Sequence, residues 1–226
     1  MLKTLILSLG ITYTALLIAS FSFQRKLIYL PSSVSPYDEA RTQERLRKWP
    51  SEQHFRGWIH ATPSDRHPGR PEPGSGTAPA AGKKGTVIVF HGNAGAALQR
   101  MYYIDALEIR GLRVILAEYP GYGGRAGVPT ETVLVNDALE TIRQAHQEFG
   151  EPIILWGESL GSGVISAAAA RTSLPLAALV LFLPWDSLPA VAQHHYPWLP
   201  ARWLVRDRYD TLRNLRSVRA PVAVLL

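Results

Sequence analysis

Ser159 stands alone between two glycines in the stretch PIILWGESLGSG. The apolar run Ile153–Trp156 before it predicts a short buried strand, and the small-residue run Val164–Ala170 after it predicts a packed helix. A Gly-x-Ser-x-Gly turn between strand and helix is typical of a nucleophile elbow, in which the serine takes a strained backbone conformation and Gly157 and Gly161 let neighbouring backbone pass closely. The pattern therefore favours a nucleophilic serine, with a plain glycine-rich turn as the alternative.

An acyl-transfer site also needs hydrogen-bond donors for the oxyanion that forms on its substrate. The Leu160 N–H, at the start of the predicted helix, is one candidate. The loop HGNAG follows the predicted strand Thr86–Phe90 and offers a second, the Asn93 N–H, because the carboxyl ends of parallel strands meet at one edge of a sheet. We expect His91 and Gly92 to support this loop, with His91 orienting backbone rather than taking the proton of the serine.

The elements that must position these residues alternate between strand and helix from residue 85 onward. Such alternation predicts an α/β fold with a mostly parallel sheet and helices on both faces. The expected strands are 53–61 (an edge strand), 86–90, 113–118, 153–156, 176–183 and 221–226, and the expected helices are 97–110, 130–149 and 164–170.

Composition narrows the function further. The chain has 226 residues, 46% of them hydrophobic and 19% charged, which fits one globular domain with a full core. Cysteine is absent, which excludes a thiolate nucleophile and a Cys-ligated metal. The net charge of +6 would suit attraction to anionic lipid or nucleic acid, but the sequence contains no long Lys/Arg run. We therefore interpret the charge as that of a generally basic proteome and expect no nucleic-acid partner. The pattern GYGGRA at 121–126 is not followed at once by a helix, so we expect no dinucleotide cofactor, and no metal.

The first segment predicts a membrane anchor over residues 1–26. Residues 5–23 carry no charge, and at about 1.5 Å per residue they cover roughly 28 Å, close to the hydrocarbon thickness of a bilayer. A cleaved signal peptide is the alternative, but its apolar run is shorter, about 7–15 residues. The basic residues after the span favour a single-pass protein with its domain, 27–226, on the cytoplasmic side. Within that domain, Pro and Gly crowd residues 62–84, which predicts a flexible insertion.

The motifs HGNAG, EYPGYGGRAG and GESLGSG, in this order, resemble those of the α/β-hydrolase superfamily. More narrowly, the chain from Gln24 onward is similar to membrane-anchored serine hydrolases of the bud-emergence-type and serine-aminopeptidase-like groups. The resemblance implies an esterase- or lipase-like enzyme that acts on a small-molecule or lipid acyl substrate without a cofactor. Glu118 stands where the family usually has Asp, and Arg125 where Ser is common; both differences affect loop packing and not the nucleophile.

A serine nucleophile needs a base and an acid, which this fold supplies in the order Ser, acid, His. The resemblance places both after the strand that PVAVLL begins, so we expect the sequence to be incomplete at its C-terminus and inactive and poorly soluble as it stands. His194 and His195 lie in a lid-like segment, 186–219, and read as lid or surface residues; Asp186 does not match the family's acid. A non-catalytic, membrane-anchored binding module with the same fold is the alternative.

Aromatic and basic residues share the lid-like segment. The aromatic residues are Tyr196, Trp198 and Trp203, and the basic ones are Arg202, Arg206 and Arg208. Together they suit contact with lipid head groups or an acyl chain. An ordinary packed and solvated helix explains them equally well.

Overall fold

The structure is a computed structural model, and it describes residues 1–35, 42, 45–61 and 83–226. Its described residues form a seven-stranded sheet in the order β2-β3-β6-β4-β7-β8-β9. The first two strands run antiparallel to their neighbours and the rest are parallel. The strands are β2 (Leu46–Trp49), β3 (Gly57–His60), β4 (Thr86–Phe90), β6 (Arg113–Ala117), β7 (Ile153–Glu158), β8 (Ala178–Phe182) and β9 (Val222–Leu225).

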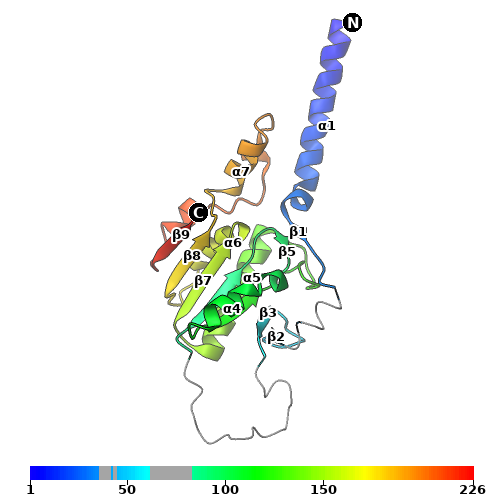
Figure 1. Cartoon of the computed structure of the whole chain (residues 1–226). Coiled ribbons are helices and arrows are strands. Elements are labelled where there is room, and N and C mark those ends of the chain that lie inside the picture. The colour runs from blue at the N-terminus through cyan, green and yellow to red at the C-terminus, as the bar shows by residue number, and fades with distance from the viewer. Residues whose placement is uncertain (36–41, 43–44, 62–82) are drawn as a thin grey trace, which may run out of the picture.

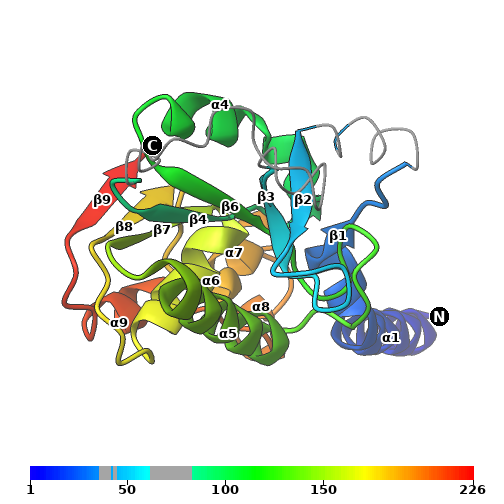
Figure 2. The same ribbon diagram turned by 90° about the horizontal axis from the view of Figure 1, so that it is seen from below.

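Helices cover both faces of this sheet (Figure 2). One face carries α5 (Glu131–Phe149) and α6 (Leu160–Ala169), and the other carries the short 3-10 helix η1 (Ala97–Arg100) and α4 (Tyr102–Glu108). Central strand β4 is buried along its whole length, as a strand covered on both faces must be. The predicted α/β architecture is therefore confirmed.

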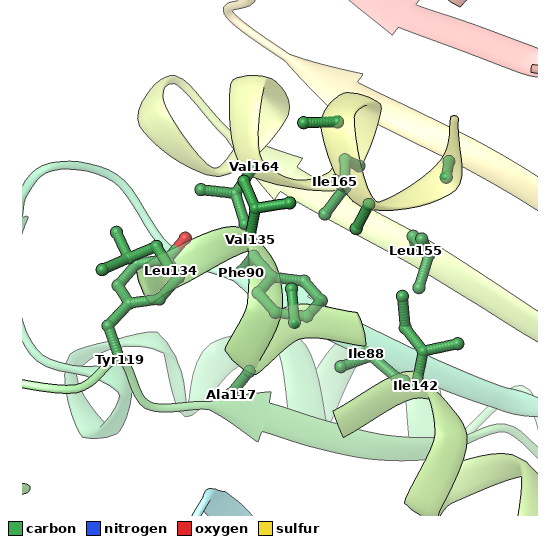
Figure 3. Close-up of a cluster of buried hydrophobic side chains, with 14 of the residues drawn as sticks. Ile88, Phe90, Ala117, Tyr119, Leu134, Val135, Ile142, Leu155, Val164 and Ile165 are labelled. Carbon is green, nitrogen blue, oxygen red and sulfur yellow. The ribbon is translucent and has the colours of Figure 1, made fainter. Parts of the chain in front are cut away.

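The helix α5 shows how the sequence specifies one of these layers. The Thr130 hydroxyl accepts a hydrogen bond from the Val133 N–H and caps the first turn, and Gly150, with φ 72°, ends the last. Between these caps, one apolar stripe faces inward. Figure 3 shows Leu134, Val135 and Ile142 of this stripe against side chains of α6 and of the sheet.

Two parts of the predicted layout were wrong. The strand near residues 53–61 was expected at the sheet edge, but β3 lies inside the sheet, and β2 pairs with its outer side. The pattern missed β2 because its four residues, LRKW, carry two basic side chains between the buried Leu46 and Trp49. The helix expected over 97–110 is split into η1 and α4. Most of the predicted insertion, residues 62–82, lies outside the described residues.

Before the sheet, α1 (Leu2–Ile28) is a single long helix that stands out from the body (Figure 1). It is long and apolar enough to cross a membrane, and none of its most apolar window is buried. It leads into β1 (Leu30–Pro31), which pairs with β5 (Ala94–Gly95). After β8 come three short helices, α7 (Leu188–His195), α8 (Ala201–Leu204) and α9 (Thr211–Leu215).

Candidate active site

Ser159 lies in the turn between β7 and α6, and its backbone has the geometry of a nucleophile elbow. Its φ is 47°, a conformation that non-glycine residues rarely adopt, and its side chain is half-buried. The strand β7 runs two residues further than predicted and α6 begins four residues earlier, so the turn contains Ser159 alone. The glycines of the motif lower the helix propensity of this first turn, which is why the pattern placed the helix start too late.

The two glycines of the elbow are required by packing. A Cβ added to Gly157 would lie 2.5 Å from the Gly161 carbonyl group, and a Cβ added to Gly161 would clash with the Phe90 carbonyl oxygen of β4. The first turn of α6 therefore lies directly against the end of the central strand. This close approach holds Ser159 at the carboxyl edge of the sheet.

The loop HGNAG lies beside Ser159, as the sequence predicted. A Cβ built on Gly92 would be 3.9 Å from the Ser159 Cβ. Neither the Asn93 N–H nor the Leu160 N–H has a hydrogen-bond acceptor among the described residues. These two donors remain the predicted oxyanion hole.

His91 orients the backbone of this loop. Its Nδ1 lies 2.8 Å from the Gly92 carbonyl oxygen, which can only accept a hydrogen bond, so the Nδ1–H donates. In a trans peptide the C=O and the following N–H point in opposite directions, so holding the Gly92 oxygen turns the Asn93 N–H to the other side. The Asn93 side chain is used elsewhere, since its Nδ2 donates to the Ile28 carbonyl at 3.0 Å. The backbone N–H of Asn93 is left for a substrate.

The other side of His91 faces Glu118, and both side chains are buried. The His91 Nε2 lies 3.1 Å from Glu118 Oε1, while Glu118 Oε2 accepts a hydrogen bond from the Ala97 N–H at 2.9 Å. Both ring nitrogens of His91 are therefore engaged, and the ring is not free to take the proton of Ser159. Glu118, where the family usually has Asp, thus links the end of β6 to the HGNAG loop and to the Ala97 N–H.

Two tyrosines of the EYPGYGG segment complete the support, and the sequence reasoning missed them. The Tyr119 hydroxyl donates to the His91 carbonyl and the Tyr122 hydroxyl to the Asn93 carbonyl, each at 2.9 Å. Arg125 then ties the same segment to α5 through two hydrogen bonds of 2.6 Å to Asp137. A phenol between turn-forming glycines, as at Tyr122, suits a hydrogen bond to a neighbouring loop, but the sequence does not indicate which loop.

Glu158 precedes the serine and points into the opposite layer. Its carboxylate accepts hydrogen bonds from the hydroxyls of Tyr102 (2.8 Å) and Tyr103 (2.6 Å) and from Arg100 Nε (3.0 Å). Burial by itself raises the pKa of Glu158, but these donors outweigh burial, and the pKa is lowered from its usual value. Glu158 is thus an ionised anchor for the elbow.

We expect Glu158→Gln to lower the free energy of unfolding at pH 7 by about 2–4 kcal/mol, because Arg100 and two phenols lose a charged acceptor. A carboxylate with a lowered pKa stabilises the fold above its unfolded pKa, and this contribution is lost as the pH falls through the folded pKa. The difference between variant and parent should therefore shrink between pH 7 and about pH 3. Urea unfolding in detergent at both values measures it.

The matched control is Glu140→Gln, which removes a carboxylate whose pKa is also lowered, to about 2, by a hydrogen bond from Arg143. That pair lies on the exposed side of α5, so its loss should change stability much less. Equal losses in the two variants at pH 7 would contradict the role given to Glu158.

The remaining candidates do not meet Ser159. No described histidine or carboxylate forms a hydrogen bond with its hydroxyl. His194 and His195 are exposed on α7, and Asp186 is exposed in the loop after β8, where its carbonyl accepts from the N–H groups at 211 and 212. Within the described ranges, no three His, Asp or Glu side chains gather where a metal ion would bind.

Comparison with known proteins identifies the family. The family model described as serine aminopeptidase, S33, matches residues 81–218, which include the oxyanion loop, the elbow and the helices after β8. The chain belongs to this family. It is an α/β-hydrolase, in agreement with the resemblance seen in its motifs.

Individual relatives agree with this assignment. The uncharacterized protein Rv2307c of Mycobacterium tuberculosis is 36% identical over 219 residues, covering 91% of this chain and 69% of the relative. Lysophosphatidylserine lipase ABHD12 of Danio rerio is 29% identical over 158 residues, covering 62% of this chain and 41% of the lipase. The chain thus spans less than half of the length of that lipase.

Solved structures show the same fold. An alpha-beta hydrolase from Vibrio vulnificus superposes with a TM-score of 0.56 at 18% identity, covering 87% of this chain and 78% of that one. The Pyrococcus furiosus esterase PF2001 gives a TM-score of 0.54 at 15% identity, with 87% and 76% covered. At these identities the likeness supports the fold alone.

Proposed function

We propose that the protein is a serine hydrolase that cleaves ester, thioester or related acyl bonds, with Ser159 as its nucleophile. The observation that carries the proposal is the strained backbone of Ser159 beside the HGNAG loop, since the N–H groups of Asn93 in that loop and of Leu160 donate to no acceptor among the described residues. Two such donors beside a nucleophile suit the oxyanion of a tetrahedral intermediate. The names of several relatives, among them a lysophosphatidylserine lipase, support a lipid or small-molecule ester as the substrate class.

In the proposed reaction, Ser159 Oγ attacks the carbonyl carbon while a base takes its proton. The carbonyl oxygen becomes an oxyanion that accepts hydrogen bonds from the Asn93 and Leu160 N–H groups. When the bond to the leaving group breaks, that group takes the proton, and the acyl group stays on Ser159 as an ester. Water then repeats the same steps and releases the acid.

The base and its acid are the incomplete part of the proposal. Among the described residues Ser159 has neither partner, so we infer that residues 1–226 alone turn over esters slowly. This observation also favours the second candidate, a binding module of the same fold. A module of that kind has no use for a serine in a strained backbone conformation, and we therefore prefer the enzyme.

The proposal includes anchoring by α1, whose 27 residues contain one long apolar window and no buried apolar side chain. A signal sequence near an N-terminus would show the same length and composition. The contacts between α1 and the body favour an anchor that stays on the protein. They include an ion pair of 3.1 Å between Arg25 and Asp207.

Labelling with a fluorophosphonate probe tests the nucleophile in the product of the full gene. Such probes form a covalent bond with an activated serine, so we expect strong labelling of the parent and none after Ser159→Ala. Undiminished labelling of the variant would reject Ser159. Absence of labelling in the parent, with the fold intact, would favour the binding module.

A further inference from the structure

A mostly apolar cavity of about 280 Å³ lies between α1 and the two helices α7 and α8, outside the turn that holds Ser159. Residues 188–205, which contain α7 and α8, form a helical hairpin. From α1 the cavity wall includes Ser20, Gln24 and Ile28; from the hairpin it includes Ala192 and Trp198. Its volume is just below the usual range for small-ligand sites, about 300–1,000 Å³.

Hydrogen bonds hold α1 and the hairpin side by side. The Tyr13 hydroxyl donates to the Trp198 carbonyl at 2.9 Å. Further along α1, the Gln24 side chain donates to the Leu204 carbonyl at 3.1 Å and accepts from the Arg206 N–H at 2.8 Å. Gln24 is also the one residue of α1 described as buried. The hairpin is thus attached to α1 at two levels, and Figure 1 shows α7 rising beside the helix.

The two attachment points place the hairpin at membrane depth. Tyr13 and Gln24 are eleven residues apart on a helix that rises 1.5 Å per residue, a separation of roughly 16 Å. Since residues 5–23 are the uncharged span, the tip of the hairpin lies alongside apolar helix rather than below it. If α1 crosses a bilayer, the hairpin must enter it as well.

The surface of the hairpin suits this position. Trp198 is 53% exposed and Trp203 84% exposed, and aromatic rings of this kind gather at membrane interfaces. Arg202 lies in the hairpin and Arg206 directly follows it, and the Arg206 guanidinium sits 5.6 Å from the centre of the Phe21 ring of α1. Positive charge at this level complements anionic head groups.

One residue of the cavity wall is linked to the candidate active site. Ile28, which lines the cavity, accepts the hydrogen bond from Asn93 Nδ2, and Asn93 is the predicted oxyanion donor. The next residue back, Gly92, lies beside Ser159. The wall of the cavity is therefore in direct contact with the loop that would hold the ester carbonyl.

We propose that α1 and the helical hairpin together form the binding site for the acyl chain of a bilayer lipid, which slides in sideways from the membrane. On this view α1 is a wall of the substrate site as well as an anchor. The inference rests on the proposed function for the fate of the ester bond at Ser159. Binding of the chain itself needs no catalysis and is tested separately.

The test uses the chain with Ser159→Ala, reconstituted in phosphatidylcholine vesicles that contain a trace of monoacylglycerol with a diazirine in its acyl chain. After irradiation, peptide mass spectrometry locates the adducts. We expect adducts on the C-terminal half of α1 and on the hairpin, and we expect excess unlabelled monoacylglycerol to compete them away. Adducts that spread evenly along α1 and resist competition would overturn the proposal, because they would report bulk lipid.

A matched pair of substitutions on α1 sharpens the test. Ser20→Phe fills the cavity from its α1 wall, whereas Ala19→Phe adds the same ring to an adjacent, exposed position that does not line it. Ser20→Phe should lower competable labelling by about tenfold, since the ring displaces several methylene groups of the chain. Ala19→Phe should leave it unchanged. Equal labelling in both variants would contradict the proposal.

A second variant covers the case in which Ser20→Phe does not fold. If Ser20→Phe fails to fold, as judged by its thermal unfolding in detergent, Ala192→Phe fills the same cavity from α7. It should lower labelling to the same degree, and unchanged labelling would overturn the proposal. Because Ser159 is absent throughout, this outcome does not depend on the fluorophosphonate experiment. If the parent is not labelled by the fluorophosphonate, the hydrolase is rejected but the lipid site is not. If the Ser159→Ala chain gives no competable lipid adducts, the lipid site is rejected but the hydrolase is not.

Discussion

Ester turnover is expected to fall by about 10⁵–10⁶-fold when Ser159 is replaced by alanine in the product of the full gene. The hydroxyl is the group that would form the acyl intermediate, and nothing else in the elbow can replace it. Oxyanion donors and substrate binding alone leave only about 10³-fold catalysis over water. Hydrolysis of p-nitrophenyl butyrate, followed by absorbance in detergent, measures the change.

Ser166→Ala is the control for this experiment. Ser166 lies about two turns further along α6 than Ser159, and its hydroxyl already donates to the Ser162 carbonyl at 2.6 Å. We expect its turnover to stay within a few-fold of the parent. A similar collapse in both variants would indicate general damage to α6 rather than loss of a nucleophile.

Residues 1–226 should be assayed beside the full gene product, wherever the gene continues past Leu226. We expect little Ser159-dependent turnover from residues 1–226, because no described base contacts the serine. Equal Ser159-dependent turnover would show that a base lies within these residues. His194 and His195 would then be the first to replace, since a movement of α7 would carry both.

The parts of the fold that could be predicted are those with a local pattern. The apolar run at 86–90 and the capped helix after Thr130 were placed within a residue of β4 and α5, because burial on both faces and end caps leave direct marks in a sequence. The elbow was found for the same reason, since the Gly-x-Ser-x-Gly pattern is itself local, although the contact of Gly161 with Phe90 is not. β2 was missed because a short outer strand carries no such mark.

The parts that could not be predicted depend on contacts between distant residues. Nothing in the sequence around Glu118 indicates that its carboxylate meets the Ala97 N–H, or that the Tyr122 hydroxyl meets the Asn93 carbonyl. The hydrogen bond from Tyr13 to Trp198 joins residues 185 positions apart. Such pairs are set by tertiary packing, so the support of the oxyanion loop and the cavity beside α1 became visible only in the structure.

Gly161→Ala is expected to lower both stability and turnover, although alanine is the better helix former. In the middle of a helix, alanine gains about 1 kcal/mol over glycine. Here the added Cβ would clash with the Phe90 carbonyl oxygen and lie 2.8 Å from the Phe90 carbonyl carbon. Both atoms belong to the backbone of the central strand β4, which cannot rotate away as a side chain could. Overpacking of this kind costs about 1–3 kcal/mol and occasionally more, and rigid neighbours place it at the upper end.

The net loss of about 2 kcal/mol corresponds to a fall of roughly 4–8 °C in the unfolding temperature of a chain of this length. To relieve the clash, α6 must move away from β4, and Ser159 moves with it. A shift of about 1 Å at a reacting group lowers the rate by a factor on the order of 10².

Circular dichroism in detergent and p-nitrophenyl butyrate turnover measure the two effects. Gly92→Ala is the stability control, because its Cβ would meet no atom closer than 3.8 Å. If Gly161→Ala had the same unfolding temperature as Gly92→Ala and the turnover of the parent, the close packing of α6 against β4 would not be required for the elbow.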